Sequence, residues 1–352
     1  MADRLPRNHG VRISADWTYL GMRTIVIENE LLRVTVLPEK GSDIVEFRYK
    51  PLDLDFLLAT PGGMRRAEAY PPSAPTPTAF LDYYSGGWNE ILPSGGVGAS
   101  YQGAVLGQHG ESSLIAWEYT FLLDAPEGVA VRLWARLLRT PLFIEKTLSL
   151  KPGRAVLEIS ETLTNEGGEP VHLMWGHHIA FGRPFLDEGA TIQIPAQRIF
   201  SQAADYLDGS GQCLPRRFRP GAVGAWPSIP ATDGSPADAS QVPPFGALQA
   251  AEMAYVTGLQ EGRFTITNPV KKVAFELQFD PALFHYIWYW QELGNVSHGY
   301  PWWGRLHAAA LEPWTSYGDG GLNEAIANGS ALLLQPGEQR STHLSASAYQ
   351  DG

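Results

Sequence analysis

Three stretches that follow one another along the chain decide the fold class: residues 129–139 (VAVRLWARLLR), 142–150 (LFIEKTLSL) and 155–164 (AVLEISETLT). In each stretch apolar and polar side chains alternate, which is typical of a strand with one buried face. Short turns at 140–141 and 151–153 join the three stretches. Alternating strands joined by short turns predict a large antiparallel sheet.

The same alternation recurs along the rest of the chain. We expect two strands within 24–38 and further strands at 43–49, 113–123, 170–181, 254–259, 263–268, 273–278, 284–292, 305–312, 330–338 and 341–349. Residues 322–327 are expected to form a short helix. Because strands do not alternate with helices, the pattern disfavours a parallel α/β fold.

The sequence therefore predicts an all-β protein, a large antiparallel β-sandwich with few short helices. We expect a single domain over residues 1–352. Residues from about 200 to 245 are rich in Pro, Gly, Ala, Ser and Asp. This composition predicts a long irregular excursion of the chain, which we expect to lie over the functional site.

The composition narrows the class of protein. With 26 basic and 37 acidic residues the net charge is -11, which argues against nucleic acid or an anionic membrane as a partner. The single cysteine, Cys213, cannot form an intrachain disulfide. We find no signal-peptide core near the N-terminus and no apolar run of ~18 residues, so we expect a cytoplasmic protein without a membrane span.

Aromatic residues make up 11% of the chain, and such rings either line sugar sites or fill β-sheet cores.

Two adjacent histidines, His177 and His178, lie between large apolar residues in the stretch 173–182 (LMWGHHIAFG). Histidine is the commonest proton donor and acceptor in catalysis near neutral pH. Neighbouring side chains of a strand point to opposite faces, so the two histidines are not expected to have the same role. One can face a cleft while the other faces the opposite layer. The alternative is one surface histidine and one hydrogen-bonded core histidine.

Three further features could belong to a site. Glu312 follows a run of small apolar residues, so we expect partial burial, which would raise its pKa toward that of a useful base. A solvent-exposed glutamate at a strand end is the alternative. Segments 86–96 (GGWNEILPSGG) and 107–111 (GQHGE) have the composition of loops that approach a ligand. For the first, a plain connecting loop is the alternative.

These motifs resemble, in order along most of the chain, those of the aldose 1-epimerases, or galactose mutarotases. Residues 27–47 are similar to the family's opening hairpin, and His109-Gly110 looks like its sugar-contacting His-Gly. Residues 178–181 (HIAF) resemble the His-x-x-Phe motif that carries the catalytic histidine. Residues 311–313 (LEP) resemble the element that carries the catalytic glutamate, and 334–338 (LQPGE) resemble the family's closing motif.

The resemblance implies a galactose mutarotase-like supersandwich that interconverts the α and β anomers of an aldose or aldose derivative, without metal or cofactor. It implies Glu312 as the base and His178 as the acid, an imidazolium that nearby carboxylates would keep protonated. Sugar contacts are expected from His109, Trp88, Asn89, His177, Gln291 and Trp290. The chain departs from the family in two places: His177 replaces the usual Asn, and Gly87-Trp88-Asn89-Glu90 stands where many members carry an arginine.

Other classes of function stay open. A non-catalytic carbohydrate-binding protein would keep the aromatic and amide contacts without needing the acid and base. A glycosidase or lyase on the same fold would need two carboxylates across one cleft, such as Glu312 with Glu90 or Glu292. A metal-dependent enzyme is disfavoured, because no His-x-His or His-Glu-x-x-His spacing joins its four candidate ligands, His109, Glu111, His177 and His178. The expected partner is a small carbohydrate; the sequence specifies neither the sugar nor the oligomeric state.

Overall fold

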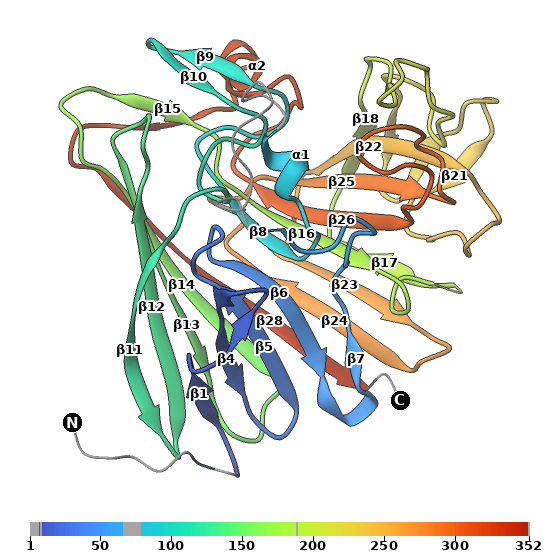
Figure 1. Cartoon of the computed structure of the whole chain (residues 1–352). Coiled ribbons are helices and arrows are strands. Elements are labelled where there is room, and N and C mark those ends of the chain that lie inside the picture. The colour runs from blue at the N-terminus through green and yellow to red at the C-terminus, as the bar shows by residue number, and fades with distance from the viewer. Residues whose placement is uncertain (1–6, 8, 66–78, 188, 351–352) are drawn as a thin grey trace.

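The computed structural model describes residues 7, 9–65, 79–187 and 189–350, which build two large antiparallel sheets (Figure 1). The larger sheet has 12 strands in the order β1 (Arg12–Ser14), β4 (Ile25–Glu28), β5 (Leu32–Leu37), β6 (Asp43–Tyr49), β8 (Trp88–Ile91), β16 (Gly176–Gly182), β26 (Ala308–Trp314), β25 (Tyr286–Leu293), β22 (Ala250–Thr257), β18 (Arg198–Ser201) and β19 (Val223–Ala225), with β7 (Leu54–Asp55) paired to β6.

The second sheet has eight strands in the order β11 (Glu118–Ala125), β12 (Gly128–Arg136), β13 (Leu142–Leu150), β14 (Val156–Asn165), β28 (Gln339–Gln350), β24 (Val273–Gln278), β23 (Arg263–Asn268) and β17 (Thr191–Gln193). Small two-stranded sheets are formed by β2 (Thr18–Tyr19) with β3 (Met22–Arg23), β9 (Ala99–Tyr101) with β10 (Ala104–Leu106), β15 (Val171–Leu173) with β27 (Leu332–Leu334), and β20 (Ser228–Pro230) with β21 (Pro236–Asp238). The helical elements are η1 (Lys50–Leu52), α1 (Ala79–Tyr83) and α2 (Leu322–Ala327).

The two large sheets share one apolar layer. Along β13, buried residues alternate with half-buried ones, so one face of this strand belongs to the layer. Phe275 of β24 contacts Phe47 of β6 and Phe181 of β16 across it, with ring centroids 5.3 and 5.0 Å apart. Removing these alternate side chains from water on both sheets is the main force that holds the sandwich together.

Strands β16 and β26 are buried on both faces, since every residue of each is shielded from solvent. Their inner faces meet the second sheet. The outer face is covered by segments that include α1, whose Phe80 ring lies 5.9 Å from the ring of His178. Polar side chains on the outer face therefore lie out of bulk water, which is the condition for large pKa shifts.

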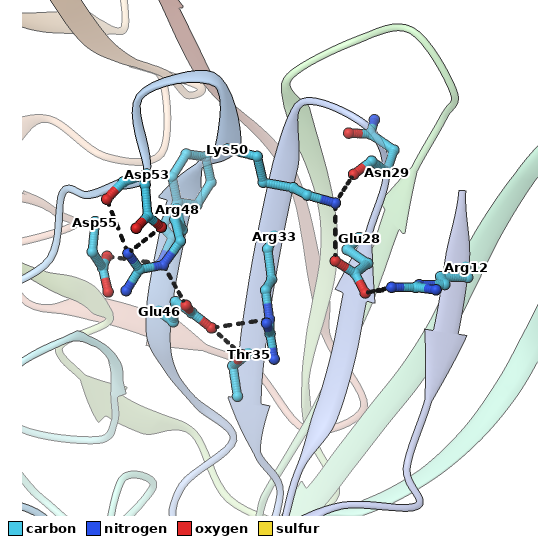
Figure 2. A network of polar contacts seen from close by, with 11 residues as sticks. Arg12, Glu28, Asn29, Arg33, Thr35, Glu46, Arg48, Lys50, Asp53 and Asp55 are labelled. Carbon is cyan, nitrogen blue, oxygen red and sulfur yellow. Dashed lines mark hydrogen bonds and ion pairs between the residues drawn. The ribbon is translucent and has the colours of Figure 1, made fainter. Parts of the chain in front are cut away.

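A network of ion pairs crosses β1, β4, β5 and β6 at one edge of the larger sheet (Figure 2). Glu28 accepts hydrogen bonds from Arg12 at 2.8 Å and from Lys50 at 3.1 Å, and Glu46 accepts one from Arg48 at 2.7 Å. These pairs are partly exposed, so each contributes little to the free energy of unfolding. Charged side chains along these strands also oppose pairing with another chain.

The prediction of an all-β sandwich with few short helices is confirmed. Strands 142–150, 263–268 and 273–278 and the helix 322–327 have the predicted bounds. Residues 170–181, predicted as one strand, instead form β15 and β16 in different sheets. The strand breaks because the Met174 N–H donates to the carbonyl of Pro93 at 2.7 Å, outside the ladder. Segment 86–96, predicted as a loop, contains β8, which pairs with β16 inside the larger sheet.

The excursion predicted at about 200–245 lies between β18 and β22 and carries the short strands β19, β20 and β21. Residues 205–209 of this excursion line the large cavity described below. Within the described parts of the chain, no helix has both the length and the apolar character needed to cross a membrane.

Gly176 offers a test of how the floor of the site is packed. A Cβ at this position would lie 2.1 Å from the indole of Trp314, whereas a Cβ at Gly168 would meet no atom within 4 Å. We expect Gly176→Ala to lower the free energy of unfolding by about 1–3 kcal/mol because the indole must move. Urea denaturation would measure the change. Gly168→Ala is the matched control, and equal stability of the two variants would contradict this packing.

Candidate active site

A cavity of about 560 Å³ opens on the outer face of the larger sheet. Its floor is built by alternate residues of neighbouring strands: Trp288, Trp290 and Glu292 of β25, Glu312 of β26 and His178 of β16. The intervening residues of β25, such as Ile287 and Tyr289, belong to the layer between the sheets. The period of two along each strand thus divides the side chains between the core and the cavity.

His178 and Glu312 meet on this floor. The register of β16 and β26 pairs Gly176 with Trp314 and Ala180 with Ala310, so it places His178 opposite Glu312. The Nε2 atom of His178 lies 3.6 Å from Oε1 of Glu312. The other carboxyl oxygen, Oε2, accepts a hydrogen bond of 2.9 Å from the indole of Trp314. Oε1 of Glu312 and Nδ1 of His178 are buried and have no hydrogen-bond partner.

Burial displaces the pKa values of the two groups in opposite directions. It raises the pKa of Glu312 to about 8, against the smaller opposing effect of the Trp314 hydrogen bond, and it lowers the pKa of His178 to about 4. At neutral pH the pair therefore holds one proton, on Glu312. The expected imidazolium at His178 does not fit these shifts, because desolvation lowers the pKa of His178 more than the hydrogen bond to its own backbone raises it.

His109 reaches the same cavity from the turn between β10 and β11. Its backbone is in the left-handed region, with φ 56°, which is uncommon for a residue with a side chain. Nδ1 accepts a hydrogen bond of 3.2 Å from the Gly96 N–H, so a neutral ring carries its proton on Nε2. Burial, and then His178 at a ring distance of 5.4 Å, keep the pKa of His109 well below its usual value. A neutral imidazole N–H is a suitable donor to a ligand hydroxyl.

Of the other predicted sugar contacts, Trp290 lines the cavity and donates a hydrogen bond of 2.9 Å to the hydroxyl of Tyr206. The sequence analysis did not single out Tyr206, Tyr84 or Trp302 as cavity residues. All three stand in segments without strand periodicity, so no local pattern indicated their direction.

The predicted contacts from Trp88, His177 and Gln291 do not fit the structure. The register pairs His177 with Glu90 and Ile179 with Trp88, so these side chains face the layer between the sheets. The indole of Trp88 donates to Nδ1 of His177 at 3.1 Å. Gln291 alternates with Trp290 and accepts a hydrogen bond of 3.2 Å from Arg217 on that opposite face.

Asn89 is paired with His178 in the ladder, so it points to the same side of the sheet as the cavity. It is nevertheless 1% exposed, lies beside Asp43 and is not part of the cavity wall. The predicted sugar contact from Asn89 therefore lacks an open path in this structure.

A second polar cluster lies between the sheets, formed by Glu90, Glu161 and His177, whose ligand atoms lie within 4.8 Å of one another. Its chemistry does not suit a metal ion. The Trp88 indole donates to Nδ1 of His177, so the neutral ring carries its hydrogen on Nε2, which then cannot ligate. The cluster instead contains its own cation, because Nζ of Lys146 lies 3.5 Å from Glu90.

The four candidate metal ligands of the sequence analysis are also dispersed. Both carboxyl oxygens of Glu111 accept backbone N–H groups, from Leu138 at 2.9 Å and Arg139 at 3.1 Å. His177 lies on the other face of the sheet from His178. His109 and His178 alone share the cavity among these four, and two histidines do not make a metal centre of the usual kind.

Residues 20–212, more than half of the chain, match the family described as a domain of unknown function (DUF4432). The chain belongs to the DUF4432 family. No curated protein matches the chain. The family description assigns no activity, so the function of this DUF4432 protein must be argued from the cavity itself.

Solved structures show what the fold is similar to. A Klebsiella pneumoniae protein provisionally named an aldose 1-epimerase has a TM-score of 0.68 at 15% identity, over 97% of this chain and 84% of that one. A galactose mutarotase-like protein from Clostridium acetobutylicum has a TM-score of 0.64 at 13% identity, over 97% and 99% of the two chains. Another from Lactobacillus casei has a TM-score of 0.59 at 14% identity, over 93% and 100%. The predicted resemblance to this group is confirmed at the level of the fold.

Lys146 offers a test of the cluster between the sheets. It is 5% exposed, and its removal would leave the carboxyl groups of Glu90 and Glu161 buried without a full counter-charge. We expect Lys146→Met to lower the free energy of unfolding by about 3–5 kcal/mol, as when one partner of a buried ion pair is removed. Chemical denaturation at pH 7 would measure it. Lys151→Met, at an exposed turn, is the matched control, and a similar small effect in both would argue against a charge-balanced cluster.

Proposed function

We propose that this protein is an aldose 1-epimerase, which speeds the exchange of the α and β anomers of an aldose. The observation that supports it most directly is the buried pair of His178 and Glu312, which lie 3.6 Å apart and line one cavity. The fold shared with galactose mutarotase-like proteins supports the proposal. His109 and Trp290 in the same cavity add a hydroxyl-binding group and a stacking surface for a sugar.

The reaction needs one base and one acid and no redox step. The base removes the proton of the C1 hydroxyl, a C1=O1 double bond forms, and the bond from C1 to the ring oxygen breaks. The acid gives a proton to the ring oxygen, which receives the bonding electrons. After rotation about the C1–C2 bond, the reverse steps close the ring on the other face and return both protons.

The pair meets this need because it holds a single proton at neutral pH. With these pKa values Glu312 holds the proton and neutral His178 is the base, the reverse of the roles that the resemblance implied. A proton that passes between them across the 3.6 Å contact exchanges the roles. Either order supplies one acid and one base, which is the requirement for ring opening.

The geometry does not favour the glycosidase alternative. Glu292 stands four residues along β25 from Trp288, the residue paired with Glu312, so the two backbone positions are roughly 13 Å apart. Glycosidase carboxyl groups lie about 5–9.5 Å apart. Glu90 faces the layer between the sheets and shares no cleft with Glu312. A non-catalytic sugar-binding protein is the alternative that the following experiment separates.

Freshly dissolved α-D-glucose, α-D-galactose and other aldoses would be followed by polarimetry and by NMR exchange spectroscopy. We expect wild type to speed anomer exchange and His178→Gln and Glu312→Gln each to lose at least ~100-fold in kcat/KM, the usual value of a general acid or base. His343→Gln, at an exposed histidine of β28, is the matched control and should keep full activity.

Two results would count against the proposal in different ways. If wild type binds aldoses but does not speed their exchange, the protein is a binding protein and not an epimerase. If wild type is active while both glutamine variants keep its rate and its fold, the chemistry belongs to other residues.

The pH dependence of kcat/KM reports the single shared proton. Below a pH of about 4 both groups are protonated and no base is left; above about 8 the pair loses its proton and no acid is left. We expect kcat/KM to be flat between these values and to fall on each side. A profile in buffers of constant ionic strength would measure this. An optimum confined to a pH above 9 would contradict the single-proton pair.

A further inference from the structure

Glu292 lies at the end of the cavity away from the His178–Glu312 pair and has no part in the chemistry above. Its side chain is 2% exposed, and both of its oxygens are within hydrogen-bond distance of the Ser297 hydroxyl, at 2.8 and 2.7 Å. A hydroxyl has one hydrogen, so it serves only one of these oxygens at a time. In its ionised form this buried carboxyl group has one donor for two oxygens, so a ligand hydroxyl can supply a further hydrogen bond.

The two ends of the cavity are set by residues that stand four positions apart along β25. The backbone positions of Glu292 and Glu312 are roughly 13 Å apart along the strands. Glu312 is hydrogen-bonded to Trp314 of β26 and Glu292 to Ser297, which follows β25, so the two carboxyl groups have separate partners. A pyranose hydrogen-bonded at both ends spans roughly 11 Å with ordinary bond lengths.

The strand positions between the two ends carry apolar side chains. Ala308 and Ala310 of β26 stand opposite Glu292 and Trp290, and both are fully buried. The indole of Trp290 lies between the two carboxyl groups along β25, and Trp302 stands 6.2 Å from it, between ring centroids. Two nearby indoles are a common surface for the C–H faces of a sugar.

Tyr206 adds a hydroxyl over the middle of the cavity. Its oxygen accepts the hydrogen bond of Trp290, which leaves its own hydrogen free for a ligand. Burial, then the nearby Glu292, raise the pKa of Tyr206, so this hydroxyl stays protonated.

The charge of the lining indicates the chemistry of the ligand. Asp205, Asp208 and Asp319 line the cavity together with Glu292 and Glu312, and no lysine or arginine of the described residues does. A phosphate or sulfonate would meet carboxyl groups without a counter-ion, at a large electrostatic cost. Burial raises the pKa of Glu292 to about 8, so near neutral pH it can donate to an uncharged hydroxyl as well as accept from one.

We infer that Glu292 and Ser297 form a distal subsite for the second ring of an uncharged reducing disaccharide, whose aldose ring lies at His178 and Glu312. This inference rests on the proposed function for the aldose end. The subsite makes Glu292 a specificity-determining residue that holds hydroxyls of the second ring.

Anomer exchange of D-glucose would be compared with that of five reducing disaccharides: maltose, cellobiose, lactose, melibiose and isomaltose. We expect wild type to show at least a tenfold lower KM for one or more of them than for glucose. Glu292→Ala and Ser297→Ala should raise that KM at least tenfold and change kcat/KM for glucose less than twofold. Glu292→Gln, which keeps a donor and an acceptor, should restore part of the loss. Glu127→Ala, in the exposed turn between β11 and β12, is the control.

Calorimetry with methyl α-glucoside and methyl β-maltoside separates the subsite from the activity, because neither glycoside can open its ring. Tighter binding of the maltoside that is lost in Glu292→Ala supports the subsite even if no aldose is exchanged. Exchange without any preference for disaccharides, or equal losses for glucose and disaccharides in Glu292→Ala, overturns the subsite and leaves the epimerase intact. Binding of glucose 6-phosphate tighter than that of glucose would overturn the assignment to an uncharged ligand.

Discussion

The structure depends on the alternation of β16, which holds two adjacent histidines on opposite faces of one buried strand. His177 faces the layer between the sheets, and His178 faces the cavity. The same alternation acts in β25 and β26, so three neighbouring strands sort their polar groups into the same two compartments. A slip of one residue in any of these ladders would exchange the compartments.

The two compartments differ in whether a cation accompanies the buried carboxyl groups. Between the sheets, Lys146 accompanies Glu90 and Glu161, so this part of the core is close to neutral. In the cavity, Glu312 and Glu292 have no cation beside them among the described residues, and their pKa values rise as a result. An acid and a base can be told apart when their environments push their pKa values apart. Here burial without a nearby cation shifts the pKa values of a histidine and a glutamate in opposite directions.

Local periodicity was sufficient to predict much of the fold. Strands such as 263–268 and 273–278 alternate clearly, and the same rule correctly separated His177 from His178. Local periodicity could not predict which distant strands pair with one another. Segment 86–96 reads as a loop, yet β8 inserts between β6 and β16, and this register decides that Trp88 faces away from the cavity.

The site was predicted less completely, for related reasons. The resemblance selected His178, Glu312 and His109, which the structure brings to one cavity. Tyr206 and Ser297 lie in irregular segments, where no period indicates the direction of a side chain. The location of the proton on the pair could not be read from the sequence either, because it depends on desolvation by neighbours such as Phe80 and Tyr84, which come from another part of the chain.

The tight packing of Gly176 against Trp314 has a consequence for how such a protein can evolve. The strands below the cavity have little room for change, since even a methyl group at Gly176 meets an indole. The segments around its mouth, 205–209 and 297–302, are not subject to this limit, because they lie outside the main sheets. The strands thus hold His178, Glu312 and Glu292, whereas Tyr206 and Ser297 lie in segments that can vary. An exchanged loop can change the contacts around the cavity while the strands that hold His178 and Glu312 stay unchanged.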